Sequence, residues 1–278
     1  MRFGFNPRIE ATTKREMAHR LMAALDAAEE LGFDVIELSL TERMYELGLR
    51  TVFGGDLLDL MQAARQRFHL HLFPPEERKQ DPGLSHPSAY PRSLHLRRLI
   101  QVIEFFEASH PMQLYLLHAG RRTSAFETHL AALRRSLDAL DTLYPGLPIA
   151  VINDWPGAVL ERPPDFLELL DAAPNLRYVF NTGLGYHSVD YNPEAYSWFL
   201  RSLGRFEDRL AEIQWSNGAP GGGLTRPIHL TLDRGVDVQR TIRSIGRNPA
   251  VVHLFDTVGV SVAALARERR TVYNGARY

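Results

Sequence analysis

Side chains that can move protons or bind hydroxyl groups stand at the ends of several apolar runs in this sequence. The run PIAVIND ends at Asn153 and Asp154, QLYLLHAG carries His118, and AVVHLFDT contains His253 and Asp256. Carboxylates and imidazoles are common general acids and bases, and an amide offers both hydrogen-bond donors and an acceptor. Polarity gathered at one end of so many runs indicates a ligand site. The full set is Asn6, Glu37, Ser39, His69, His71, His118, Asn153, Asp154, Asn181, Gln214, Asn217, His253 and Asp256.

The apolar runs that carry these residues have the length and composition of β-strands. Helical patterns, with apolar residues at spacings of three and four, lie between them. The alternation predicts one α/β domain over residues 1–278, a (β/α)8 TIM barrel, with a doubly wound open sheet as the alternative. Because the carboxyl ends of barrel strands form one mouth, we expect the polar residues to converge on one pocket. The runs cover residues 2–7, 33–40, 67–73, 113–120, 148–154, 176–183, 210–217 and 250–257.

The composition limits the classes of function. The 278 residues, 45% of them hydrophobic, suffice for one barrel, and 32 Lys and Arg against 33 Asp and Glu give no general attraction to nucleic acid or membranes. The absence of cysteine excludes disulfides, thiolate metal sites and cysteine nucleophiles. No segment has the pattern of a signal peptide or the length of about eighteen apolar residues that a membrane span needs. We therefore expect a cytoplasmic protein with a small-molecule substrate and no nucleic-acid or membrane partner, and homo-oligomers are compatible with the sequence.

Short motifs in the same order along the chain resemble the xylose isomerase-like barrels. This superfamily includes sugar isomerases and epimerases and the apurinic endonucleases of the endonuclease IV type. GFDVIELSL is similar to its second strand, HLHLFPP to its third and YLLHAG to its fourth. VINDWPG stands where the family commonly has Glu-Asn, and VFNTGLG stands where it has Asp-Thr-Gly-His. EIQWSN stands where the family has a histidine followed three residues later by aspartate. RPIHLTLDRGVD is similar to a histidine-containing segment of the family. The resemblance implies the (β/α)8 fold and isomerase or epimerase chemistry.

The resemblance also implies a divalent metal, held by Glu, Asp, His and Glu from strands five to eight, and here the sequence departs from the family. A hard cation prefers anionic oxygen ligands, whereas a neutral amide supplies only a weakly binding carbonyl. We therefore expect no metal at the usual site. The residues at those places are Asn153, Asn181, Gln214 and, depending on the register of the last strand, His253 or Asp256.

Three interpretations of these amides are open. They can bind a polyhydroxylated or amide-bearing molecule by directional hydrogen bonds. Alternatively, a register shifted by one residue turns Asp154 and Asp256 inward beside His71 and His118, and a zinc or manganese cofactor is then compatible with the sequence. In the third interpretation the amides are structural and cap strand ends by hydrogen bonds to the backbone.

For an isomerase or epimerase, the chemistry needs a base next to a substrate carbonyl and a group that stabilises the developing oxyanion. The candidate catalytic bases are Asp154, Asp256 and Glu37, and His71 and His118 are candidate donors to the oxyanion. The resemblance adds His187, which lies close to Leu184, the place of a family histidine. It also adds His229, which, with His71 and His118, matches histidines that bind further zinc ions in the endonuclease branch. The predicted substrate-binding residues are His71, His118, Asn153, Asn181, His187, Gln214, Asn217, His229 and His253.

Two other functions are alternatives. A barrel that binds a small molecule without catalysis, within a specialised pathway, fits the loss of charged ligands. An apurinic endonuclease requires a full set of zinc ligands and a cationic DNA surface, and the sequence lacks both. Arg121 and Arg122, before a Thr-Ser pair, could hold an anion, or they are solvated surface residues. The histidines on helices or loops are expected at the surface, namely His19, His86, His95, His110 and His129.

Overall fold

The computed structural model describes residues 1–9, 11–74, 83–217, 232, 235–256 and 261–277. Eight strands close into a barrel in sequence order, β1 to β8, and every pairing resolved between neighbouring strands is parallel. The predicted TIM barrel is confirmed, and the open sheet is excluded. The strands are β1 (Arg2–Phe5), β2 (Val35–Leu40), β3 (Arg67–Leu72), β4 (Leu114–Leu117), β5 (Ile149–Ile152), β6 (Arg177–Asn181), β7 (Leu210–Trp215) and β8 (Val252–Phe255).

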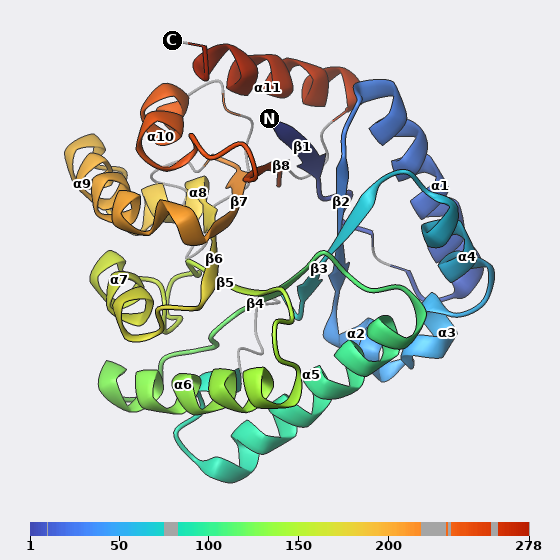
Figure 1. Cartoon of the computed structure of the whole chain (residues 1–278), viewed down its shortest axis with the longest axis horizontal. Helices are drawn as coiled ribbons and strands as arrows, with labels where there is room; N and C mark the ends of the chain where they lie inside the picture. Colours follow the sequence, from blue (N-terminus) through green and yellow to red (C-terminus); the bar gives the residue numbers. More distant parts are fainter. Residues whose placement is uncertain (10, 75–82, 218–231, 233–234, 257–260, 278) are drawn as a thin grey trace. The chain divides into compact units, whose positions relative to one another are not determined.

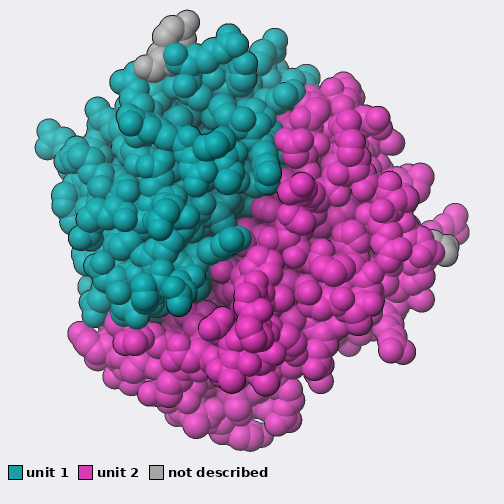
Figure 2. All heavy atoms as spheres, in the orientation of Figure 1, with its two compact units in different colours: residues 1–4, 150–278 teal, residues 5–149 magenta. Residues whose placement is uncertain are grey.

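The chain divides into two compact units, which Figure 2 shows in different colours. One unit comprises residues 5–149, and the other comprises residues 1–4 and 150–278. The single domain predicted over residues 1–278 stays a prediction. The first unit contains α1 (Lys14–Leu31), α2 (Glu42–Glu46), α3 (Leu49–Phe53), α4 (Asp56–Ala63), the 3-10 turn η1 (Gly83–Ser85), α5 (Ala89–Ser109) and α6 (Phe126–Leu143). The second contains α7 (Pro163–Ala172), α8 (Thr182–His187), α9 (Pro193–Leu203), η2 (Gly204–Arg209), α10 (Val238–Ile245) and α11 (Val262–Gly275).

Helix α1 shows how local sequence sets the elements. The hydroxyl of Thr13 accepts the N–H of Glu16 at the N-terminus, and Gly32 ends the helix in the left-handed conformation with φ of 61°. The apolar face is buried against β2 and α4, which lie beside α1 in Figure 1. Its buried residues recur every three or four positions, as the periodicity predicts, and are Met17, Leu21, Ala24, Ala28 and Leu31.

Strand β2 shows how the strands position polar side chains. All six of its residues are buried, as expected for a parallel barrel strand that is covered on both faces. Side chains alternate between the two faces, so that one face is apolar and the other carries Glu37 and Ser39. The parallel register places Glu37 beside His69 and Ser39 beside His71 on β3. In the other unit, the register places Asn181 of β6 beside Gln214 of β7. The strands thus gather polar residues of neighbouring runs on the same face, as period-two alternation requires.

Candidate functional site

The first candidate site lies in residues 5–149 and is called the histidine cluster: Asn6, Glu37, Ser39, His71 and His118. Glu37 Oε1 lies 3.1 Å from Nδ1 of His71, and Nε2 of His71 lies 2.6 Å from Nε2 of His118. The two imidazole rings are stacked, with centroids 4.9 Å apart. Asn6 Nδ2 donates to Glu37 Oε1 at 2.7 Å and to Ser39 Oγ at 3.1 Å. A carboxylate and two imidazoles therefore stand in one continuous row.

Burial affects the protonation of His71, the middle residue of this row. His71 and Glu37 are buried, whereas His118 is half-buried. The pKa of His71 is lowered: burial is the largest cause, His118 and Arg8 act in the same direction, and the neighbouring Glu37 carboxylate opposes them. With Glu37 ionised, only an N–H at Nδ1 of His71 satisfies the carboxylate. Neutral His71 then accepts the Nε2 proton of His118, and a proton can pass along the row.

The contacts within the cluster bear on the predicted roles of Glu37 and His71, which stay predictions. Glu37 was expected to act as a base and His71 as a donor to the oxyanion. Both nitrogens of His71 are used within the cluster, and Glu37 accepts hydrogen bonds from Asn6 and His71. In this arrangement Glu37 orients His71, and His118 is the half-buried member. Asn6 and Ser39 were predicted among the polar strand ends that converge with Glu37, and Asn6 hydrogen-bonds to both Glu37 and Ser39.

The second candidate site lies in the other unit and is called the amide network: Asn153, Asn181, Gln214, Ser216 and Asp256. Asn181 is its centre. Its Nδ2 donates to Gln214 Oε1 at 3.2 Å and to Asp256 Oδ2 at 3.3 Å. Its Oδ1 accepts the hydroxyl of Ser216 at 2.8 Å and the N–H of Leu184 at 3.0 Å, so that Asn181 also caps α8. All five residues are buried.

Asn153 makes a different kind of contact. Its Oδ1 accepts the backbone N–H of Asn181 at 2.7 Å, and its Nδ2 donates to the backbone carbonyl of Asn181 at 3.0 Å. Beyond the end of β5, the Asn153 side chain therefore makes the two hydrogen bonds to β6 that a strand backbone would otherwise make. This geometry fits the interpretation in which the amide caps a strand end by bonding to the backbone.

The amide network does not fit the divalent metal that the sequence resemblance implies. The hydrogens of Asn181 Nδ2 point at Gln214 Oε1 and Asp256 Oδ2, the oxygens that a cation would need. Both polar atoms of Asn153 are bonded to backbone. Within the described residues, no group of three or more His, Asp or Glu side chains is arranged to hold a metal ion.

The register of the last strand selects Asp256 over His253 as the network residue. His253 Nδ1 accepts the indole N–H of Trp215 at 3.1 Å, and the two rings are stacked with centroids 6.0 Å apart. Trp215 alternates with Gln214 along β7 and so faces the opposite side. His253 packs with Trp215 and Phe3, and its predicted role in substrate binding stays a prediction. Burial lowers the pKa of His253 to about 4.

Two further predicted residues, Asp154 and His187, make the following contacts. Asp154 Oδ1 accepts the N–H of Trp155 at 2.9 Å, and its own N–H donates to Leu160 O. His187 ends α8, with its ring edge-on to Tyr191 at 5.5 Å. His229 lies outside the described residues.

Close approaches of backbone explain two glycines beside the network. Asn217 is buried against Gly235, where a Cβ atom would lie 2.7 Å from its Oδ1. Gly185 has a similar reason to be glycine, since a Cβ there would lie 2.5 Å from the ring of Phe180.

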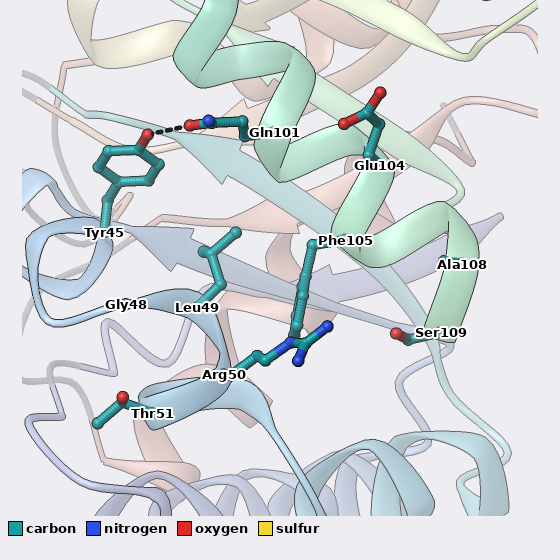
Figure 3. Close-up of a pocket in the computed structure, with 10 residues that line it drawn as sticks. All are labelled: Tyr45, Gly48, Leu49, Arg50, Thr51, Gln101, Glu104, Phe105, Ala108 and Ser109. Carbon is teal, nitrogen blue, oxygen red and sulfur yellow. Dashed lines mark hydrogen bonds between the residues drawn. The ribbon is translucent and has the colours of Figure 1, made fainter.

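A hollow of about 650 Å³ lies elsewhere in the first unit, on its helices. Figure 3 shows Leu49 and Arg50 of α3 opposite Phe105 of α5, with Tyr45 hydrogen-bonded to Gln101 at one side. It contains none of the predicted site residues.

No helix in the described part of the chain combines the length and the hydrophobicity that crossing a bilayer requires.

Comparisons with known proteins support the fold and leave the function open. No family model matches the sequence, and neither does any curated protein. A D-tagatose 3-epimerase-like protein matches with a TM-score of 0.70 and 13% identity, over 100% of this chain and 97% of the other. An IolI protein with a binding zinc atom matches with a TM-score of 0.64 and 14% identity, over 99% and 98%. An AP endonuclease of family 2 from Brucella melitensis matches at 0.63 and 13%, over 97% and 98%. The chain therefore has the xylose isomerase-like barrel fold that its motifs predicted.

Proposed function

We propose that the protein is an isomerase or epimerase that moves a proton next to the carbonyl of a small polyhydroxylated substrate, using the histidine cluster as acid and base. The row formed by Glu37, His71 and His118, with contacts of 3.1 Å and 2.6 Å, carries the proposal. Structurally similar proteins include a D-tagatose 3-epimerase-like protein and a 3-keto-D-glucoside 4-epimerase, which supports the reaction class by fold alone.

The proton balance of the proposed step is simple. A proton leaves the carbon next to the substrate carbonyl for the half-buried ring of His118. As His118 becomes charged, its Nε2 proton moves to Nε2 of His71. His71 is then an imidazolium whose Nδ1–H faces the Glu37 carboxylate, and this ion pair stabilises the charge at a buried position. The reverse transfer returns the proton to the neighbouring carbon on the same face, which is an isomerisation; an epimerisation requires the bound enediolate to turn its other face to His118 before the proton returns.

The test is proton exchange with solvent. Purified protein is incubated in D2O with a panel of ketoses, aldoses and keto-polyols, and deuterium at the carbon next to the carbonyl is measured by NMR and mass spectrometry. We expect incorporation with at least one class of compound. His118→Ala and His71→Ala should each lower the rate by about 10²–10⁴-fold, the usual contribution of a general acid or base. His19→Ala, on the exposed face of α1, is the control and should leave the rate unchanged. Equal rates in the His118 and His19 variants would contradict the proposal.

A small-molecule-binding barrel without turnover is the second candidate. The observation that favours it is the amide network, whose buried amides bond to one another and to backbone and contain no group that acts as a base. This candidate predicts that a ligand from the same panel raises the melting temperature while no deuterium enters it. Ligand binding without exchange, unaffected by His118→Ala, would favour this second function.

A further inference from the structure

We propose that His129 is a positioning residue, which fixes the segment following β4 and thereby holds His118 within reach of His71. The proposal rests on the proposed function for its catalytic consequence, although the contacts that carry it are independent of that function. The sequence predicted that His129 lies at the surface. The side chain is instead completely buried on α6, and this prediction was wrong.

His129 joins two separate segments through both of its ring nitrogens. The N–H at Nδ1 donates to the backbone carbonyl of Ser85 at 2.8 Å. Nε2 accepts the backbone N–H groups of Thr123 at 3.0 Å and Ser124 at 3.2 Å. These bonds need one tautomer of neutral imidazole, with the proton on Nδ1 and the lone pair on Nε2. A single side chain therefore satisfies one buried carbonyl and two N–H groups.

The contacts of Ser85 extend this junction to the histidine cluster. The backbone N–H of Ser85 donates to the carbonyl of Ala119 at 3.2 Å, and Ala119 directly follows His118. The carbonyl of Leu84 accepts the hydroxyl of Ser136 at 2.8 Å, so that α6 also fixes η1 from a second position. The segment after β4 is thus held at Ala119 through η1 and at residues 123–124 through His129. His118 lies at the start of the segment that these two attachments fix.

The same contacts argue against an anion site in this segment. The N–H groups of Thr123 and Ser124, which could have faced an anion, are directed at His129. Arg122 lies over the ring of Phe126 at 5.3 Å. Burial lowers the pKa of His129, and Arg122 and His86 lower it further against the opposing effect of the Ser85 carbonyl. A proton on Nε2 would face the backbone N–H groups of Thr123 and Ser124, which need an acceptor there. The junction therefore requires the neutral ring.

Two partial replacements separate the two attachments. His129→Asn keeps a donor near the position of Nδ1, toward Ser85, and loses the acceptor for residues 123–124. His129→Gln places its amide near the position of Nε2 and loses the donor to Ser85. If His118 is positioned through Ser85 and Ala119, the Gln variant should lower kcat by about tenfold with little change in KM, because small displacements of a catalytic group are costly. The Asn variant should retain more of the activity.

A structural readout separates this proposal from the proposed function. The ring nitrogens of His71 and His118 are observed by 15N NMR in the wild type, both His129 variants and His19→Ala, with folded fractions matched by circular dichroism. We expect the His118 signals to shift in the Gln variant, less in the Asn variant, and not at all in the His19 control. Unchanged His118 signals in a folded Gln variant would overturn the positioning role. Shifted signals in a protein that exchanges no substrate protons would uphold it and reject the proposed function instead.

Discussion

The histidine cluster and the amide network are both polar and buried, yet they differ in what their hydrogen bonds connect. In the cluster, the side chains of Glu37, His71 and His118 contact one another, and each can change its charge. In the network, Asn153 bonds to backbone and Asn181 caps α8, and neither can titrate. Polar residues at strand ends therefore serve two purposes in one fold. The first arrangement can store a proton, whereas the second holds strand ends and a helix in place.

The largest expected effect is on catalysis in the cluster. Glu37→Gln keeps the shape of the side chain and removes the charge that stabilises protonated His71. We expect the rate of deuterium incorporation to fall by about 10²–10⁴-fold. Ser39→Ala is the matched control in the same cluster, since Ser39 accepts only the longer bond from Asn6, at 3.1 Å. Equal losses in the two variants would mean that polarity, and not the proton row, is what the cluster provides.

The next effect is on stability in the network. Asn153→Ala leaves the buried N–H and carbonyl of Asn181 without their side-chain partner. We expect the free energy of unfolding to fall by about 2–4 kcal/mol, measured by urea denaturation. Asn274→Ala, at an exposed position of α11, should change it by less than about 0.5 kcal/mol. A stable Asn153→Ala protein that has lost ligand binding would show that the amide serves the ligand directly.

A smaller effect concerns pH and lies outside both groups. The folded pKa of His253, about 4, is below the ordinary value of about 6.5. Between these values the unfolded chain binds a proton that the folded chain does not. The contribution of neutral His253 to the free energy of unfolding is therefore fully present above the unfolded pKa, and it is lost as the pH falls toward the folded pKa. The contribution should be about 2 kcal/mol between pH 7 and pH 5. His253→Asn keeps an acceptor for Trp215 without titrating, and its unfolding free energy should depend less on pH over this range. The same pH dependence in both proteins would assign it to other groups.

The next prediction concerns the metal content of the amide network. Because the Asn181 amide directs hydrogens at Gln214 and Asp256, we expect purified, untagged protein to hold far less than one divalent ion per chain at this position. Elemental analysis with anomalous scattering measures it. A full-occupancy ion bound by Asp154 and Asp256 would show that the side chains rearrange, and it would favour a metal-dependent isomerase. Zinc bound by His71 and His118 alone would leave the prediction for the network intact.

The last expectation is an absence of effect. The near-balance of 32 basic and 33 acidic residues gives little counterion-release drive for duplex binding. The protein should leave a DNA duplex with an abasic site uncut, although an AP endonuclease shares its fold. Cleavage that a chelator abolishes, measured on a denaturing gel, would contradict this and would place the protein with the endonucleases.

The strands could be predicted because their signal is local. Each predicted run ends at most three residues beyond the observed strand, as residues 113–120 do against Leu114–Leu117. Contacts between distant residues gave no such signal. Asn153 and Asn181 are 28 positions apart, and His129 meets Ser85 across 44 positions. A polar strand end looks the same in sequence whether its amide faces a ligand or a backbone. The histidine on an amphipathic helix likewise carries no mark of the buried carbonyl that it satisfies.

The two hydrogen bonds from the Asn153 side chain to the backbone of Asn181 limit which mutations position 153 can accept. A carboxylate at position 153 could still accept the N–H, but it would lose the donor that the carbonyl requires. Introducing a charged ligand there would thus cost stability before any bound ion could offset the loss. A path to a metal-bound barrel would have to change position 181 or the start of α8 first. The order of mutations, and not only their number, would then decide whether a metal-bound barrel can be reached.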